Sequence, residues 1–187
     1  MATNTSSRLD SEFHTPGNCT ACGYQPQTVS PSDAVVALRS FPRRFRAALA
    51  IHLDDPDPSG TLTSAPYPGG WSALEHAGHV RDILHALDLR LHRVLREDTP
   101  TLPETPQTPP GGANEQGPEV VLAALTVNAE QLARTVSAVP GSDWLRRARR
   151  GGQDVTVLEL AREAVHEGVH HLKALQQVLD HVRHTGV

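Results

Sequence analysis

Apolar residues recur at intervals of three or four positions along most of this chain, which is the spacing of an amphipathic helix. Four stretches show this pattern, at residues 32–53, 72–96, 118–139 and 155–184. Segments rich in proline, glycine and other turn residues separate them. The segment at 97–117 is longer than a tight turn needs; it is predicted to cross the length of a bundle, and a loose lid is the alternative. The pattern therefore predicts an all-α fold, a four-helix bundle with a long crossover connection.

Local signals mark the ends of two of these helices. Ser72 and Thr156 each precede a periodic stretch, and each is followed three residues later by a glutamate. This is the capping-box pattern, in which two side chains satisfy free backbone donors at a helix start. Pro42 lies inside the first stretch, where it removes a backbone donor. We therefore predict a kink there, or a restart of the helix capped by Ser40.

Composition and charge narrow the class of protein. Hydrophobic residues make up 38% of the 187 residues and aromatic residues only 4%, so the core must come from leucine, valine and alanine, as in helix bundles. The net charge of −4 lacks the basic field of a nucleic-acid-binding protein. No apolar run approaches the roughly 18 residues of a membrane span, and the N-terminus lacks the apolar core of a signal peptide. We expect a cytoplasmic protein without nucleic-acid or membrane partners.

The polar, turn-rich residues 1–31 are predicted to form an irregular N-terminal segment, separate from a bundle domain at 32–187. This segment holds Cys19 and Cys22 in a Cys-x-x-Cys-Gly pattern, which is half of a zinc ribbon. The chain has no second Cys-x-x-Cys. Three interpretations follow: a metal-free turn, an ordered knuckle with His14 and another ligand as a second structural site, or a redox or metal-handling dithiol.

The last stretch carries a pattern typical of metal ligands. His166 and His170 are four residues apart, so both imidazoles project from one face of a helix and can reach one cation. The second stretch offers His79 as a third ligand, with His76 and His85 as alternatives by spacing. Three ligands from two helices would leave coordination positions open, as in catalytic metal sites.

Other polar residues near these histidines have possible supporting roles. Asp82 and Glu167 are the nearest acidic neighbours and could orient an imidazole or accept a proton. His171 could face outward and donate a hydrogen bond to a ligand. Four arginines at 146–150 favour a solvated loop over an anion site.

Two motifs resemble those of the DinB-like and YfiT-like metal-dependent proteins. The first is WSALEHAGHVRDIL, with a Trp-Ser opening and a histidine eight residues after the tryptophan; the second is HEGVHHLKAL near the C-terminus. The CTACG stretch is similar to an actinobacterial-type subgroup of that family. The resemblance covers residues 32–184. It implies a four-helix bundle that binds a divalent metal, often zinc or nickel, through His79, His166 and His170, and frequently a homodimer.

The resemblance also suggests an activity, because some members of the family are transferases or isomerases that use a low-molecular-weight thiol. A divalent ion on three neutral imidazoles keeps its positive charge and would hold a thiol as the reactive thiolate. We therefore predict a thiol-dependent S-transferase or isomerase acting on a small-molecule electrophile. The alternatives are a metal-dependent hydrolase and a non-catalytic metal-binding stress-response protein.

Overall fold

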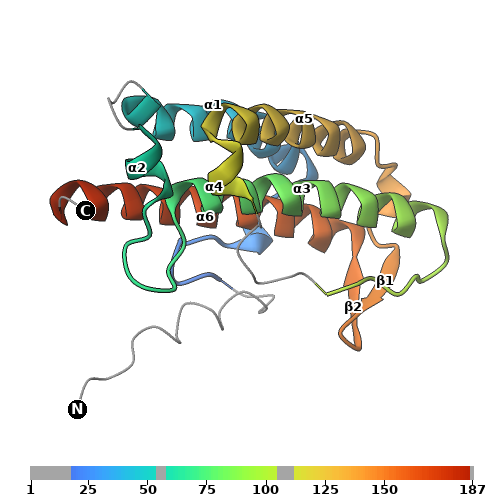
Figure 1. The fold of residues 1–187 in the computed structure, drawn as a ribbon. Coiled ribbons are helices and arrows are strands. Elements are labelled where there is room, and N and C mark those ends of the chain that lie inside the picture. The colour runs from blue at the N-terminus through green and yellow to red at the C-terminus, as the bar shows by residue number, and fades with distance from the viewer. Residues whose placement is uncertain (1–17, 54–57, 105–111, 186–187) are drawn as a thin grey trace, which may run out of the picture.

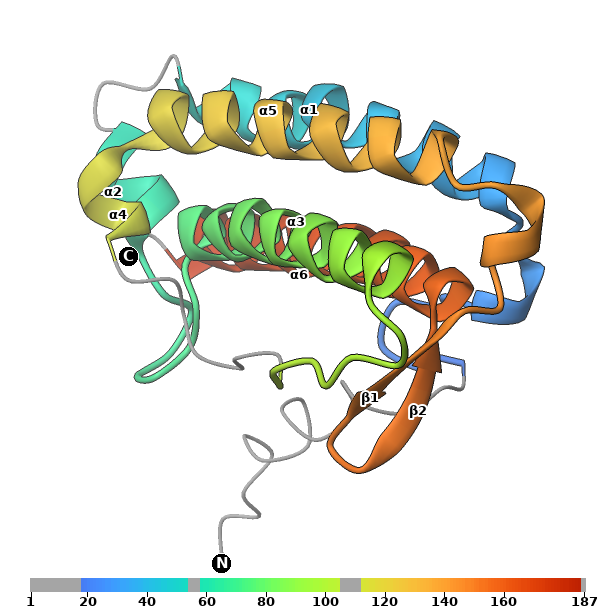
Figure 2. The ribbon, with the colours of Figure 1, turned by 90° about the vertical axis from the view of Figure 1, so that its right-hand side faces the viewer.

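The computed structural model describes residues 18–53, 58–104 and 112–185 of the chain. Four long helices form two layers (Figure 1, Figure 2). One layer holds α1 (Pro31–Leu53) and α5 (Pro118–Ser137), and the other holds α3 (Ala73–Arg96) and α6 (Val157–Thr185). The main contacts join α1 and α3 each to both α5 and α6. The predicted all-α four-helix bundle is confirmed.

The connection between α3 and α5 explains the long linker in the sequence. The two helices are neighbours, and both begin at the same end of the bundle (Figure 1, Figure 2). Parallel neighbours can be joined only by a connection that returns along the whole bundle. Its described parts include a short helix, α4 (Ala113–Gln116), which buries Ala113. The crossover is therefore present as predicted.

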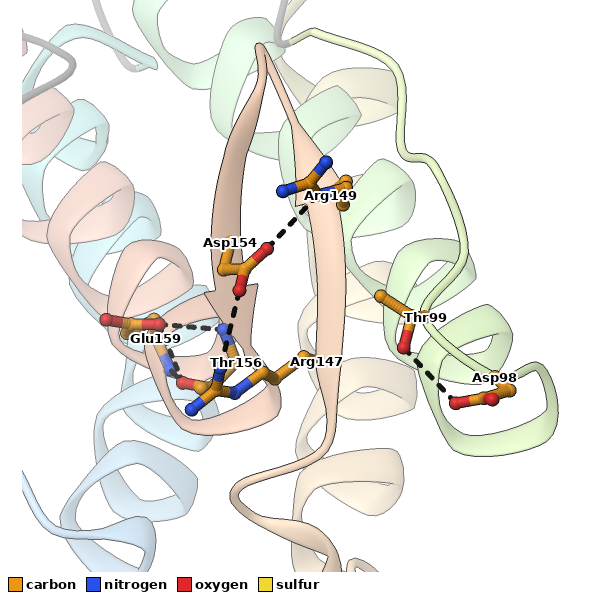
Figure 3. Close-up of polar contacts among 7 residues, drawn as sticks. All are labelled: Asp98, Thr99, Arg147, Arg149, Asp154, Thr156 and Glu159. Carbon is orange, nitrogen blue, oxygen red and sulfur yellow. Dashed lines mark hydrogen bonds and ion pairs between the residues drawn. The ribbon is translucent and has the colours of Figure 1, made fainter.

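Both predicted capping boxes are present. At the start of α3, the Glu75 amide donates to Ser72 Oγ at 3.1 Å, and the Ser72 amide donates to Glu75 Oε2 at 2.8 Å. At the start of α6, the Thr156 amide donates to Glu159 Oε2 at 2.7 Å, and the Glu159 amide donates to Thr156 Oγ1 at 3.2 Å (Figure 3). These two helices carry the candidate metal ligands His79, Glu167 and His171, which are described below.

The predicted restart at Pro42 is wrong, because α1 continues through this proline. The Ser40 hydroxyl donates to the carbonyl of Ala37 at 2.7 Å instead of capping a new helix. Phe41 and Phe45 on either side are fully buried and meet edge to face, with ring centroids 6.3 Å apart. Burying each phenylalanine contributes about 1.5–3 kcal/mol, which offsets a proline cost of about 3 kcal/mol.

Glycine lets α6 approach α1 closely. A Cβ atom added to Gly168 would lie 2.2 Å from ring atoms of Phe41, so a side chain fits only if the buried Phe41 ring or the helices shift. Gly168 therefore faces α1, on the buried side of α6.

Two linkers hold more regular structure than the sequence predicts. Residues 54–70 were expected to be a loop but contain the helix α2 (Pro58–Thr63), whose Leu62 is buried. Between α5 and α6, a short 3-10 helix, η2 (Gly141–Asp143), precedes a hairpin of β1 (Arg147–Arg150) and β2 (Gln153–Thr156). Two consecutive glycines with φ of +57° and +78° form its turn, as a type I′ hairpin requires.

The predicted solvated arginine loop is thus an ordered hairpin, and its arginines have partners. Arg147 and Arg149 both reach the Asp154 carboxylate across the ladder, at 3.4 and 3.3 Å (Figure 3). Arg150 pairs with Glu163 of α6 at 2.8 Å, with both side chains mostly buried. Beside the strand, the turn at Asp98 and Thr99 leads into the crossover (Figure 3). The crossover pairs with β1, because the Arg149 amide donates to the Pro100 carbonyl. These contacts attach the hairpin to the bundle end.

The described part of the N-terminal segment contains a 3-10 helix, η1 (Pro26–Thr28), and lies against α6. The Tyr24 hydroxyl donates to the carbonyl of Arg162 at 2.8 Å, and Arg162 Nε donates to the carbonyl of Val29 at 3.0 Å. Lys173 Nζ donates to the carbonyl of Ala21 at 2.7 Å. His14, expected to complete a knuckle, lies outside the described residues. Among the described residues, no helix is long and apolar enough to span a bilayer.

Candidate metal centres

Helix α6 carries two overlapping pairs of metal-ligand side chains, each with a spacing of four residues. One pair is His166 and His170, and the other is Glu167 and His171. Because successive helix residues are about 100° apart, the two pairs point to different sides of α6. The structure therefore assigns them to different surroundings.

The three histidines that were expected to share one ion fall into two groups. His79 lies with Glu167 and His171 in a group that we call the inner cluster. His166 and His170 lie with Cys19 and Cys22 in a second group, the lateral cluster, made by these four residues. Within each cluster the possible ligand atoms are all within 4.8 Å of one another.

In the inner cluster, one carboxylate oxygen lies between two imidazoles. Glu167 Oε2 is 3.4 Å from His79 Nε2 and 3.3 Å from His171 Nε2. The three residues are 6% or less exposed. These distances exceed the roughly 2.7–3.2 Å of an N–H to oxygen hydrogen bond, and Glu167 Oε2 makes no hydrogen bond to any described residue. Among the described residues, the oxygen therefore has two close imidazole contacts but no hydrogen bond, which buried polar atoms normally have.

A metal ion fits this arrangement. Nitrogen and oxygen donors held roughly 2.0–2.2 Å from one tetrahedral zinc ion are about 3.4 Å apart, which matches both measured separations. Two imidazoles and a carboxylate are also a donor set that divalent zinc accepts. The inner cluster therefore has the donors, the spacing and the burial of a three-ligand metal site.

Burial and neighbouring groups set the charges in the inner cluster. Burial lowers the pKa of His171, so its imidazole is neutral at pH 7 and able to bind a metal. Burial favours the neutral form of Glu167, but close contacts with His171 and His79 outweigh it and lower the pKa of this carboxyl below its usual range. The cluster therefore offers a cation the negative charge of Glu167 and the neutral imidazole of His171.

Two aromatic residues hold the imidazoles in place. His76 Nδ1 is 2.9 Å from His171 Nδ1, so a hydrogen bond joins the two rings. If His171 Nε2 binds a metal, its proton must be on Nδ1, which then donates to His76. The Trp71 ring stacks on His171 with centroids 5.6 Å apart, and it also contacts His76 and His79. Both residues thus limit the freedom of a candidate ligand.

The lateral cluster is built on a tight turn. The Gly23 amide donates to the carbonyl of Cys19, and the Cys19 amide donates to the carbonyl of Tyr24, both at 2.8 Å. Gly23 has a φ of +80°, which other residues rarely adopt. Cys19 is buried and Cys22 is partly buried, and burial raises the pKa of Cys22 to about 11. The turn directs this pair of thiols toward α6.

Two imidazoles of α6 meet these thiols. Cys19 Sγ is 3.6 Å from His170 Nδ1. The Tyr24 ring stacks on His166 at 5.1 Å between centroids, and His166 Nε2 is buried without a hydrogen bond to a described residue. Burial, followed by the neighbouring His171 and His166, lowers the pKa of His170 to about 4.

The remaining candidates lie elsewhere. Asp82 is exposed and pairs with the adjacent Arg81 at 2.6 Å, on the surface of α3. His85 is exposed. His171, considered as an outward-facing donor, is instead 2% exposed. The sequence pattern of paired histidines did not identify Glu167 and His171 as ligands. Their own spacing of four residues could have identified them, because they lie on the same side of α6 as the buried Ala164 and Gly168.

Comparisons with known proteins agree with this fold. A family model of the DinB superfamily matches residues 42–175. Among solved structures, YfiT from Bacillus subtilis is similar, with a TM-score of 0.70 and 18% sequence identity over 87% of this chain and 94% of that chain. YfiT is described as a probable metal-dependent hydrolase with an unusual four-helix bundle topology. No curated protein matches significantly. Because the family model spans well over half of its 187 residues, this chain belongs to the DinB superfamily.

Proposed function

We propose that this protein is a metal-dependent enzyme whose inner cluster, His79, Glu167 and His171, holds one divalent ion. The observation that carries the proposal is the buried oxygen Glu167 Oε2, which has no hydrogen bond to a described residue and lies at metal-ligand spacing from two imidazole nitrogens. Zinc is the ion we propose, because it binds imidazole and carboxylate donors with this spacing. Nickel is the alternative suggested by the family resemblance.

Three protein ligands leave room for a further ligand. A divalent ion held this way supplies Lewis-acid activation of a water or thiol nucleophile at neutral pH. Sites with two histidines and one glutamate occur in zinc hydrolases, which supports hydrolysis as one activity. The description of YfiT supports the same class. Thiol-dependent transfer or isomerisation of a small electrophile is the second activity, supported by the resemblance in the two histidine motifs.

The protein's own residues would then hold and shield the site. The hydrogen bond that His171 donates to His76 orients the His171 ring, and the stacked Trp71 ring restricts the same imidazole. Both ligand-bearing helices start with capping boxes. A buried charge lies near the cluster: Arg90 is 4% exposed, and its guanidinium interacts electrostatically with the carboxylates of Glu163 and Glu167. These contacts support a site whose ligands are positioned before a substrate arrives.

Metal binding is the first test. Purified protein is dialysed against zinc or nickel, and bound metal is counted by elemental analysis beside the Glu167→Gln and Asp82→Asn variants. Glu167→Gln keeps the shape of the side chain but removes its charge, so we expect it to lose one equivalent. Asp82→Asn alters an exposed carboxylate and should bind as much as the wild type. Equal metal content in all three proteins contradicts the assignment of the inner cluster.

Activity assays then separate the two chemistries. A panel of small esters and amides is tested for hydrolysis without thiol, and small electrophiles are tested for conjugation or isomerisation with and without added low-molecular-weight thiols. Turnover that requires metal but no thiol indicates a hydrolase, whereas turnover that requires both indicates a thiol-dependent enzyme. Tight metal binding with neither activity contradicts the catalytic part of the proposal and favours a metal-binding stress-response protein.

A further inference from the structure

The lateral cluster brings together residues that are far apart in the sequence. The Cys-x-x-Cys-Gly motif supplies two thiols, and α6, more than 140 residues later in the chain, supplies two imidazoles. The four possible ligand atoms lie within 4.8 Å of one another. Two thiolates and two imidazoles form one of the standard four-ligand sets of structural zinc sites.

The distance between the two halves of the cluster matches that set. A thiolate sulfur roughly 2.3 Å and an imidazole nitrogen roughly 2.0–2.1 Å from one tetrahedral zinc ion are about 3.5–3.6 Å apart. Cys19 Sγ and His170 Nδ1 are separated by 3.6 Å. His166 Nε2 is buried and forms no hydrogen bond to a described residue, although buried ring nitrogens normally find a partner.

The local backbone also suits a metal knuckle. The turn closed by the Gly23 amide and the Cys19 carbonyl places both cysteines on one side, and the glycine allows the positive φ that this turn needs. Both cysteines are free thiols in the structure. Hydrogen bonds from Tyr24 and Lys173 attach the same segment to α6 on either side of the cluster.

We infer that Cys19, Cys22, His166 and His170 bind one zinc ion in a closed tetrahedral site that fastens the N-terminal segment to α6. All four positions are filled by protein atoms, so this ion has no place for a substrate and its role is structural. It is distinct from the ion proposed for the inner cluster, and the inference does not depend on that ion. The two sites are nonetheless adjacent, because the rings of His170 and His171 have centroids 5.2 Å apart.

Cobalt substitution provides a test that reports on sulfur ligands alone. The full chain is stripped of metal under reducing conditions and titrated with Co²⁺. We expect a sulfur-to-cobalt charge-transfer band in the wild type, and its loss in Cys19→Ser, Cys22→Ser and His170→Asn. Glu167→Gln serves as the matched control, because it alters the neighbouring position on the same helix and should keep the band. Absence of the band in the wild type overturns the inference.

A second measurement needs no change to the lateral cluster, so it remains valid if the cysteine variants fail to fold. X-ray absorption at the zinc edge is recorded on Glu167→Gln protein loaded with one equivalent of zinc. We expect two sulfur neighbours at about 2.3 Å and two nitrogen neighbours at about 2.0–2.1 Å. A shell of nitrogen and oxygen alone, or a disulfide between the two cysteines in zinc-loaded protein, overturns the inference.

These experiments keep the two sites separate. If the proposed enzyme function fails because the inner cluster binds no metal, the sulfur-to-cobalt band is still expected in the wild type. If the lateral zinc site is absent, metal can still bind at His79, Glu167 and His171 without any sulfur signal. The two failures therefore give different spectra.

Discussion

The inner and lateral clusters share one helix and one ligand spacing and each contain a pair of imidazoles, but they differ in burial, in the element that faces α6 and in their remaining donors. The inner cluster pairs α6 with α3, is almost fully buried and has three nitrogen and oxygen donors. The lateral cluster pairs α6 with the N-terminal segment, is only partly buried and has two sulfur and two nitrogen donors. The first leaves coordination positions open, whereas the second is complete. Identical spacing thus leads to different chemistry, depending on which element faces each side of the helix.

The comparison also shows how little separates the two roles. A rotation of one residue, about 100° around α6, changes the partner of a ligand pair from a helix to a turn with two cysteines. The buried face of α6 includes Gly168, which lies close to Phe41 of α1, and a long set of apolar residues. Because this face must be buried, packing between apolar residues decides which pair of polar residues enters the bundle.

The largest expected effect is a loss of zinc affinity at the inner cluster, which tests directly whether the two clusters have different ligands. His171→Ala should lower the affinity of the inner cluster for zinc by more than about 100-fold, because loss of a direct ligand exceeds the 10–100-fold typical for a residue that supports one. Competition with a coloured chelator measures this affinity. His170→Ala, the adjacent change, should leave it near the wild-type value. A larger loss in His170→Ala would favour the set His79, His166 and His170 that the sequence predicts.

The second prediction concerns the stabilising role of the lateral cluster. With free zinc at about 100 times its dissociation constant, a structural ion adds about 2.7 kcal/mol to the free energy of unfolding. For a chain of this size, that amounts to about 5–11 °C in melting temperature. The double variant Cys19→Ser, Cys22→Ser should show this loss in a thermal melt, and a strong chelator should produce it in the wild type. Thr20→Ser, between the two cysteines, should melt like the wild type.

A double variant that melts at the wild-type temperature and keeps its zinc content would contradict a structural role for these cysteines. His181→Ala is a further control on α6, because this exposed histidine lies about four turns beyond the first ligand position. It should change neither zinc content nor melting temperature.

A smaller loss of zinc affinity is expected when a residue that orients a ligand, rather than a ligand itself, is removed. His76→Ala removes the hydrogen bond to His171, so the affinity of the inner cluster for zinc should fall by about 10-fold, the low end of the range for such partners. The sulfur-to-cobalt band of the lateral cluster should be unchanged. His85→Ala, on the exposed side of α3, is the matched control for the same titration. Equal behaviour of the two variants would remove His76 from the site.

The last prediction concerns the pH dependence of the metal-free protein. Burial and neighbouring imidazoles lower the pKa of His170 to about 4, whereas the unfolded chain has the ordinary value of about 6.5. Between these values the unfolded state binds a proton that the folded state does not, so the free energy of unfolding should fall as pH decreases through this window. Urea denaturation of the metal-free wild type and of His170→Asn checks the sign. The variant should show a flatter decline.

The sequence determined most of the fold. Helical periodicity located all four long helices, since their apolar stripes must be buried whatever the details of packing. The capping residues Ser72 and Thr156 marked two helix starts because capping is local. The length of the segment at 97–117 indicated the crossover. The restart predicted at Pro42 was wrong, because burial of Phe41 and Phe45 outweighs the local preference of proline, and the sequence does not show where these rings pack.

The candidate site was determined only in part. The sequence identified the helices, the type of chemistry and His79, His166 and His170 as possible ligands. It could not assign them to groups, because the pairs starting at His166 and at Glu167 have the same spacing and only tertiary packing shows which one faces α3. The contact between Cys19 and His170 joins residues 151 positions apart, and no local pattern encodes such a distance. Local forces thus fixed the helices and their donors, whereas burial of one face of α6 decided which donors meet.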